Sequence, residues 1–347
     1  MKLFLSLVLF AAFLLCPAAC ADGVRDGLTL AAREALPALF PFFVAGGLLV
    51  RTGFADALGR VLARPLARLY RLPPAAAPAV VLGLTGGYPV GAATAAGLVQ
   101  QGALSPADAA RVNSFCNCAS PGFCIGLAGL GVFGSARTGA ALYGIHLLAA
   151  LLTGLFTARG GAAPRAPARM AAGCAPPREG FAAAFCGAVQ QAAGTALTVT
   201  AFLTVFSILL QLLEPALAHV PFGAAAAGLL ELTSGLDRLP ALPLPAPWRL
   251  TLTSFLLGFG GLAVQFQVRA VAASAGLPAD GFAAAKLLHG ALGALLTAAL
   301  FRLSPAALAA SAPGAAMPPL LRPMPAALLA FAALFAIWGG KQTKNKV

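Results

Sequence analysis

The sequence predicts an all-α polytopic membrane protein with an inverted repeat and two re-entrant or broken-helix segments. Three observations support this prediction. Of 347 residues, 60% are hydrophobic and only 10% are charged, whereas soluble domains are about half apolar and a quarter charged. The basic residues gather in short stretches between apolar runs. Glycine-bearing interruptions divide the apolar sequence at residues 85–91 and 231–235.

The basic stretches indicate how the chain is oriented. A net charge of +13 could also indicate a nucleic-acid-binding protein, but such proteins gather basic residues on one face with aromatic or motif support. We therefore expect contact with a lipid bilayer and none with nucleic acid. The positive-inside rule places three clusters in the cytoplasm: Arg51, Arg60, Arg64, Arg68 and Arg71; Arg159, Arg165, Arg169 and Arg178; and Lys341, Lys344 and Lys346.

The first 21 residues have two interpretations. Lys2, an apolar run and a small-residue segment resemble a secretory signal. A lipoprotein cleavage site ending at Cys20 fits poorly, because Pro17 occupies its third upstream position. The apolar stretch is also long enough to span a bilayer, for which about 17 to 25 residues serve. We favour an uncleaved transmembrane helix over residues 1–21, with a cleaved signal as the alternative.

The other spans follow the apolar runs in order. Complete spans are expected over residues 36–50, 140–157, 192–213, 250–268, 282–301 and 325–339. The runs 78–100 and 222–232 are interrupted or too short to cross, which indicates re-entrant hairpins or half-helices. If Lys2 is cytoplasmic and both short segments return to the side they came from, the C-terminus is also cytoplasmic, as is Lys286.

Similar short patterns recur in the two halves in the same order, at separations of 148, 140 and 143 residues: Leu84–Gly87 with Leu232–Gly235, Ser114–Phe115 with Ser254–Phe255, and His146 with His289. Breaks that enter from opposite sides and recur in order are typical of an inverted repeat. The predicted organisation is a first helix over 1–21, a first repeat over 28–157, a basic cytoplasmic loop over 158–180, a second repeat over 181–303, and a C-terminal transmembrane helix with a basic tail over 304–347.

The first interruption offers backbone groups to a ligand. A broken helix frees N–H and C=O groups that lipid cannot satisfy, so such breaks persist only inside protein or beside a watery cavity. Glycines allow left-handed backbone, proline prevents a regular helix, and tyrosine adds a hydroxyl. A packing kink is the alternative. The candidate binding residues are Thr85, Gly86, Gly87, Tyr88, Pro89 and Gly91.

The second interruption offers a carboxylate. Glu231 lies within an apolar stretch, where an acidic side chain is costly unless it has a role. It could coordinate a cation, carry a proton or hydrogen-bond a polar solute. The alternative is an interfacial position near Arg238. The candidate binding residues are Glu231, Thr233, Ser234 and Gly235.

Amides and hydroxyls form two further candidate groups that suit a neutral polar ligand, with interhelical hydrogen bonding as the alternative. His146 and His289 are each isolated in a span. We expect them to be packing donors, with proton relay as the alternative. The candidate ligands are Asn117, Ser120 and Pro121 in one group and Gln265 and Gln267 in the other.

Cysteine usage and the absence of catalytic patterns argue against several functions. Seven cysteines, an odd number, predict no disulfide framework in so apolar a chain. The spacing of Cys116, Cys118 and Cys124 is not that of a zinc site, so we expect small packing residues. No nucleophile–base pair, phosphate loop or metal triad is recognisable. We therefore expect neither an enzyme nor a metal or other cofactor.

Several motifs together form a specific pattern: Leu39, Phe40, Pro41, Phe42 and Phe43; Gly83, Gly87, Tyr88, Pro89, Gly91 and Ala92; Phe115, Asn117, Pro121 and Phe123; Glu231, Thr233 and Gly235; and Phe259, Gly260, Gly261, Gln265, Gln267 and His289. Over most of the chain, this pattern resembles the YlbJ-type sporulation integral membrane proteins of the nucleoside recognition (Gate) domain family. The resemblance implies a Gate-type fold, shared with concentrative nucleoside transporters and ferrous-iron permeases, and a part in endospore formation. Hydroxyl residues common in the family are replaced by Gly86, Cys116, Ala119 and Ala263, which implies weaker or altered substrate binding.

These features predict a transporter or permease-like protein of the cytoplasmic membrane. It would move a small polar solute, with nucleoside-like compounds as first candidates, by rocking one repeat against the other. The alternative is a non-transporting membrane component of spore envelope assembly that acts through protein partners. The sequence specifies no oligomeric state.

Overall fold

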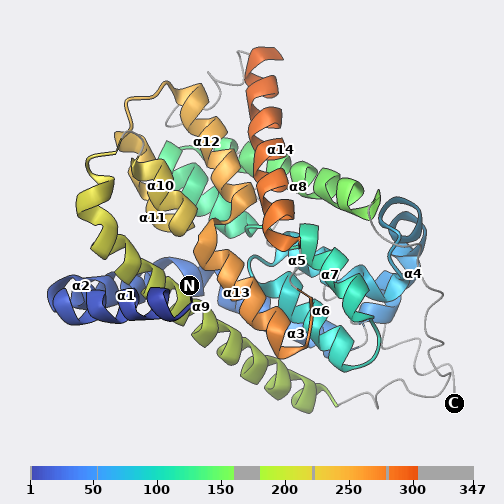
Figure 1. The fold of residues 1–347 in the computed structure, drawn as a ribbon. Coiled ribbons are helices and arrows are strands. Elements are labelled where there is room, and N and C mark those ends of the chain that lie inside the picture. The colour runs from blue at the N-terminus through green and yellow to red at the C-terminus, as the bar shows by residue number, and fades with distance from the viewer. Residues whose placement is uncertain (1, 53, 160–179, 221–222, 279–280, 304–347) are drawn as a thin grey trace, which may run out of the picture.

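The computed structural model is a bundle of helices, many of them short or broken (Figure 1). It describes residues 2–52, 54–159, 180–220, 223–278 and 281–303. No strand occurs in these five stretches. Most of the basic loop predicted over residues 158–180 lies outside them, as does the whole span predicted over residues 325–339.

The helices divide between two halves, with α marking α-helices and η marking 3₁₀- or π-helical segments. The first half contains α1 (Lys2–Leu15), α2 (Pro17–Leu30), η1 (Ala31–Ala35), α3 (Leu36–Arg51), α4 (Phe54–Pro65), η2 (Leu66–Tyr70), η3 (Pro74–Ala76), α5 (Ala77–Thr85), α6 (Val90–Gln100), α7 (Pro106–Phe115), η4 (Gly122–Val132) and α8 (Ala136–Arg159). The second contains α9 (Phe181–Leu217), α10 (Gly223–Leu230), α11 (Leu232–Arg238), η5 (Leu239–Ala241), α12 (Ala246–Phe259), α13 (Gly261–Ser274) and α14 (Phe282–Leu303).

Within the described residues, four helical segments are long and apolar enough to cross a membrane, or five if the bent pair α1–α2 counts as one span. Large apolar side chains remain exposed on all four of them: Phe156 on α8, Leu197 on α9, Trp248 on α12 and Leu295 on α14 are examples. In a bilayer such side chains face lipid. The prediction of an all-α polytopic membrane protein is therefore confirmed. The four segments are Ala136–Ala158, Phe181–Leu217, Ala246–Ser274 and Phe282–Leu300.

The N-terminal segment is two helices rather than the single helix predicted over residues 1–21. The chain bends by 99° between α1 and α2. Cys16 leaves the helical region, with φ −124° and ψ 56°, and Pro17 begins α2, where its missing N–H is not needed. α2 packs closely on α9, because a Cβ atom at Gly23 would lie 2.4 Å from the Ile208 Cα atom.

The two halves arrange their later helices in the same order. In the first half, the hairpin α5–α6 precedes a broken helix, α7 and η4, and then the long helix α8. In the second half, the hairpin α10–α11 precedes α12 and α13, and then the long helix α14. α14 contacts α7, α8 and α12, so it joins the halves at the centre of the bundle (Figure 1).

Candidate functional site

The first hairpin break, residues 86–89, lies between α5 and α6 and packs on the end of α7. A helix break is therefore present where the sequence predicts it. A Cβ atom at Gly83 would lie 1.9 Å from the Cys116 carbonyl oxygen, and one at Gly91 would lie 1.8 Å from it. Only glycine lets both helices of the hairpin touch this backbone.

Within this break, the predicted binding residues have different roles. Gly87 turns the chain with φ +91°, and Gly86 and Pro89 complete the turn. The Thr85 hydroxyl donates only within α5, to the Val81 carbonyl oxygen at 2.8 Å. The buried Tyr88 reaches the other half of the chain, where its hydroxyl donates to the Leu257 carbonyl oxygen at 2.6 Å.

The α7 break, residues 116–121, follows α7 and precedes η4. Asn117 is buried in it, and both ends of its amide are used. Its Oδ1 atom accepts the Ala92 N–H at 3.0 Å, and its Nδ2 atom donates to the Asn113 carbonyl oxygen at 3.0 Å. Asn117 therefore connects the first hairpin break to the α7 break through backbone groups of α6 and α7.

The other predicted residues of the α7 break begin η4. The Ser120 hydroxyl oxygen accepts the Phe123 N–H at 3.1 Å, and Pro121 directly precedes η4. The Cys118 N–H donates to the Gly83 carbonyl oxygen at 3.0 Å. Side chains predicted as ligands thus bind backbone groups at helix ends here. A break inside a membrane protein requires such partners, because lipid cannot form hydrogen bonds with the freed groups.

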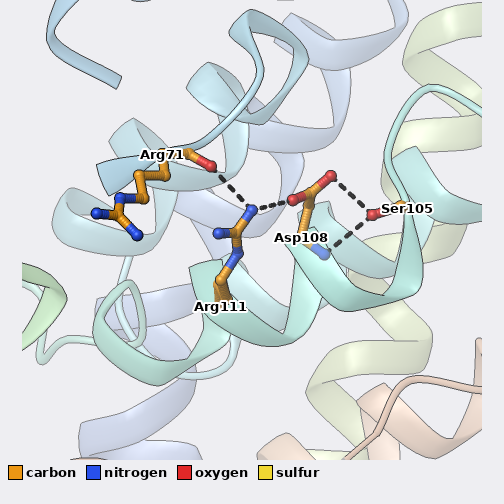
Figure 2. Close-up of polar contacts among 4 residues, drawn as sticks. All are labelled: Arg71, Ser105, Asp108 and Arg111. Carbon is orange, nitrogen blue, oxygen red and sulfur yellow. Dashed lines mark hydrogen bonds and ion pairs between the residues drawn. The ribbon is translucent and has the colours of Figure 1, made fainter. Parts of the chain in front are cut away.

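The start of α7 is held by a separate polar network, which Figure 2 shows. The Ser105 hydroxyl accepts the Asp108 N–H at 3.1 Å and donates to its carboxylate at 2.7 Å. Arg111 pairs with Asp108 and donates to the Arg71 carbonyl oxygen at 2.8 Å. This N-terminal cap fixes the start of the helix whose other end forms the α7 break.

The second hairpin break is Glu231 itself, which caps the N-terminus of α11. The residue is buried, and its two carboxylate oxygens accept the N–H groups of Thr233 at 3.0 Å and Ser234 at 2.6 Å. The Gly235 N–H donates to the Glu231 carbonyl oxygen at 3.1 Å. Arg238 pairs instead with Glu214 at 2.7 Å, so Glu231 is a buried helix cap rather than an interfacial partner of Arg238.

The α12 break, at Gly260, divides a span that the sequence analysis treats as continuous over residues 250–268. Gly260 and Gly261 have φ values of 81° and 70°, which strongly favour glycine. Gln265 donates back across the break to the Phe259 carbonyl oxygen at 3.3 Å. Gln267 is also buried, but its amide makes no hydrogen bond with any described residue.

Each half contains a similar pair of hydroxyl groups, and a pair of histidines connects the halves. The Ser114 and Thr157 hydroxyls lie 3.1 Å apart, and the Ser254 and Thr297 hydroxyls lie 2.6 Å apart, with a sequence separation of 43 in both pairs. The two histidines of the sequence pattern meet in space. His146 and His289 stack with ring centroids 4.5 Å apart, and His289 Nε2 donates to the His146 carbonyl oxygen at 3.0 Å.

Lys286 is the residue that the sequence analysis places wrongly. Counted there as a cytoplasmic positive charge, it is fully buried on α14. Its Nζ atom donates to the Asn117 carbonyl oxygen at 2.9 Å, lies 3.3 Å from His289 Nδ1, and lies 5.1 Å from the centroid of the Tyr88 ring. Its position three residues before His289, on the same helix face, is the sequence signal that could have placed it in the core.

Cys118, His146 and His289 place their ligand atoms within 4.8 Å of one another, but their hydrogen bonds do not suit a metal ion. His146 Nε2 accepts the Ala119 N–H at 3.0 Å, so the proton of the neutral ring is on Nδ1. His289 directs Nδ1 toward the Lys286 amine. In this arrangement neither ring has a free lone pair for a metal ion.

Two buried amides keep unused hydrogen-bonding capacity within the described stretches. Asn113 Oδ1 is buried without a partner, and Gln267 makes no hydrogen bond to a described residue. Buried polar groups are usually paired, so such groups are candidates to bind a polar ligand. Gln267 is a predicted binding residue, whereas Asn113 belongs to the polar sequence around Asn117 but is not among the predicted ligands.

Two adjoining cavities, of about 50 and 290 Å³, follow α6. The smaller one reaches Val90, the first residue of α6, and the larger one reaches Gln100 at its end. None of the predicted binding residues lines either cavity, although Val90 lies between Pro89 and Gly91 in sequence. Both cavities are lined by Ala93, Gly97, Gln191 and Thr195; Arg51 and Gln101 line the smaller one, and Thr198 and Ser274 the larger one.

Comparisons with known proteins show two similarities in sequence. Residues 32–136 match the family model Gate, described as nucleoside recognition, and this region contains the first hairpin break and the α7 break. The chain is 25% identical over 324 residues to the sporulation integral membrane protein YlbJ of Bacillus subtilis (strain 168), covering 82% of this chain and 78% of the relative. No solved structure matches the chain. The resemblance to YlbJ-type sporulation integral membrane proteins with a nucleoside recognition (Gate) domain is therefore confirmed.

Proposed function

We propose that this protein moves a small polar solute across the cytoplasmic membrane. The observation that carries the proposal is the direct connection between breaks. Asn117 joins the first hairpin break to the α7 break, and Tyr88 joins it to the α12 break. Transporters place broken helices at the centre of the membrane, where half-helix ends and freed backbone groups surround a solute.

An inverted repeat would supply the required motion. The same order of hairpin, broken helix and long helix in both halves supports this interpretation. The matched pairs Ser114–Thr157 and Ser254–Thr297 support it further. Alternating access would then arise from movement of one repeat against the other.

The unused polar groups indicate the kind of solute. Asn113 and Gln267 offer amide donors and acceptors but no charge, which suits a neutral polar compound. The larger cavity, about 290 Å³, is slightly smaller than typical ligand pockets, which hold about 300–1,000 Å³. Neither Asn113 nor Gln267 lines this cavity, so the proposal places solute recognition at the two amides and access along α6.

A role in spore formation is the physiological part of the proposal. It is supported by the similarity to a relative named as a sporulation integral membrane protein. Transport would then supply or remove a polar solute during that process.

A ligand screen followed by uptake tests the proposal. The purified protein is screened by thermal shift against nucleosides, dipicolinate-like acids and divalent metals, and each stabilising compound is then tested for uptake into liposomes. We expect at least one neutral polar compound to raise the melting temperature, because ligands stabilise the state that binds them. The same compound should enter liposomes that contain the wild type.

Two glutamine variants make the test specific. Gln267→Leu should lose both stabilisation and uptake, because it removes a buried amide without another partner. Gln190→Leu, on an exposed position of α9, is the matched control and should keep both. Compounds that stabilise the protein but never enter wild-type liposomes would contradict transport and favour a role in envelope assembly.

A further inference from the structure

The buried ammonium group of Lys286 requires an explanation beyond packing. A charged group inside a membrane protein is costly and is usually paired with an opposite charge or with backbone carbonyls. No carboxylate in the described stretches forms an ion pair with Lys286, whereas Arg25 pairs with Asp22, Arg111 with Asp108 and Arg238 with Glu214. The ammonium therefore depends on neutral partners.

Those partners come from three different parts of the bundle. The α7 break supplies the Asn117 carbonyl oxygen at 2.9 Å, and α14 supplies His289 Nδ1 at 3.3 Å. The first hairpin break supplies the face of the Tyr88 ring, with its centroid 5.1 Å away. An oxygen, a nitrogen and an aromatic face are together the surroundings that a cation prefers.

The carbonyl is the informative partner. α7 ends at Phe115, so the Asn117 carbonyl oxygen lies beyond the helix and has no helical N–H to accept. Freed carbonyls and half-helix C-terminal ends are the groups with which broken-helix transporters coordinate a cation. Here an amine on a side chain occupies this position.

The corresponding carbonyl of the other half is bound by Tyr88, which also contacts Lys286. Leu257, 140 residues after Asn117, lies near the end of α12, and its carbonyl oxygen accepts the Tyr88 hydroxyl at 2.6 Å. Tyr88 therefore contacts Lys286 with its ring and the α12 end with its hydroxyl. Through this pair, the charge on α14 stabilises the ends of two broken helices together.

We propose that the Lys286 ammonium is a tethered replacement for a coupling cation, held between the α7 break, Tyr88 and His289. This proposal rests on the proposed transport function, because only a transporter would have a coupling cation to replace. Its consequence is that the arrangement of the breaks described above is stable without bound Na⁺ or K⁺.

Tyr143 offers a matched comparison within the chain. It precedes His146 by three residues, as Lys286 precedes His289. Its hydroxyl also donates to a carbonyl oxygen at the end of a broken segment, that of Leu84, at 3.3 Å. Tyr143 makes this contact without a charge, so Tyr143→Phe removes an equivalent hydrogen bond but no cation.

The test measures melting temperature in NaCl, KCl, choline chloride and ethylammonium chloride at equal ionic strength. The proteins are the wild type, Lys286→Ala and Tyr143→Phe, all purified without added solute. The wild type should melt at the same temperature in all four salts. Lys286→Ala should melt lower, and ethylammonium should raise its melting temperature by about 2–4 °C relative to choline, because it restores the missing ammonium. Tyr143→Phe should show no such rescue.

Two results would overturn the proposal. One is a wild type stabilised by Na⁺ or K⁺ relative to choline, which would reveal a separate bound cation. The other is a Lys286→Ala variant whose melting temperature is the same in ethylammonium chloride and choline chloride. The wild-type measurement decides the matter even if Lys286→Ala does not fold. Since none of these measurements contains a solute, their outcome is independent of the uptake test of the proposed function.

Discussion

The hairpins α5–α6 and α10–α11 both break within apolar sequence, but different residues satisfy their freed backbone groups. In the first hairpin the partners come from elsewhere in the chain: the Asn117 side chain accepts the Ala92 N–H, and the Tyr143 hydroxyl donates to Leu84. In the second, Glu231 caps α11 with its own carboxylate.

This difference indicates how each break depends on the rest of the bundle. The first hairpin packs directly on the α7 break, because Gly83 and Gly91 both lie against the Cys116 backbone. The second carries its main polar partner within four residues of sequence. We therefore expect changes at the first hairpin to affect the whole bundle and changes at the second to have smaller, local effects.

The largest expected effect is at Gly91. In Gly91→Ala the new Cβ atom would lie 1.8 Å from the Cys116 carbonyl oxygen and 2.9 Å from the Gly83 Cα atom. Both are backbone atoms, so we expect a loss of about 3 kcal/mol or more of unfolding free energy. Thermal unfolding followed with a thiol-reactive dye measures the loss, because Cys116, Cys118 and Cys124 are buried in the folded protein.

Two further glycines calibrate this prediction. Gly228→Ala in the second hairpin meets the Leu256 Cδ1 atom at 2.7 Å, a flexible side chain, and should lose only about 1 kcal/mol. Gly97→Ala has no atom within 4 Å of its new Cβ and should gain about 0.5–1 kcal/mol of helix stability. If Gly91→Ala were as stable as Gly97→Ala, the close packing of α6 on the α7 break would be refuted.

The next effect concerns the cap of the second hairpin. Glu231→Ala leaves the Thr233 and Ser234 N–H groups without their acceptor, and we expect a loss of about 1–2 kcal/mol. Glu231→Gln keeps one acceptor oxygen and should lose less. The melting temperature of the purified variants measures both changes.

The matched control for this cap is Glu214→Ala. Glu214 pairs with Arg238, but its side chain is 45% exposed, so the pair is worth about 0–1 kcal/mol. An equal loss in Glu214→Ala and Glu231→Ala would show that the buried carboxylate contributes no more than an exposed one, contrary to the geometry at α11.

Much of the fold follows from local sequence. The runs predicted over residues 36–50, 140–157 and 282–301 correspond to α3, α8 and α14, because each is predominantly apolar over its whole length. The breaks at residues 85–91 and at Glu231 are also visible, since clustered glycine and proline, or a carboxylate in apolar surroundings, disturb the pattern.

The remaining features depend on partners far away in sequence. The α12 break is absent from the prediction because Gly260 and Gly261 leave the apolar run intact. The buried position of Lys286 depends on Asn117, 169 residues earlier, and the contact between His146 and His289 depends on how the halves pack. Such long-range pairs determine the candidate site, and composition and periodicity do not contain them.

The smallest expected effect compares the matched hydroxyl pairs of the two halves. Ser254 and Thr297 are buried, lie 2.6 Å apart and have no other hydrogen bond within the described stretches. Thr297→Val therefore leaves a buried hydroxyl unpaired and should cost about 1 kcal/mol. In the first half, Ser114 also donates to the Arg111 carbonyl oxygen at 2.7 Å. Thr157→Val therefore leaves the Ser114 hydroxyl with a partner and should cost only a few tenths of a kcal/mol. The melting temperatures of both variants measure the difference. Equal losses would show that the two pairs are equivalent in energy as well as in position, and the difference between the halves would then be confined to their hairpins.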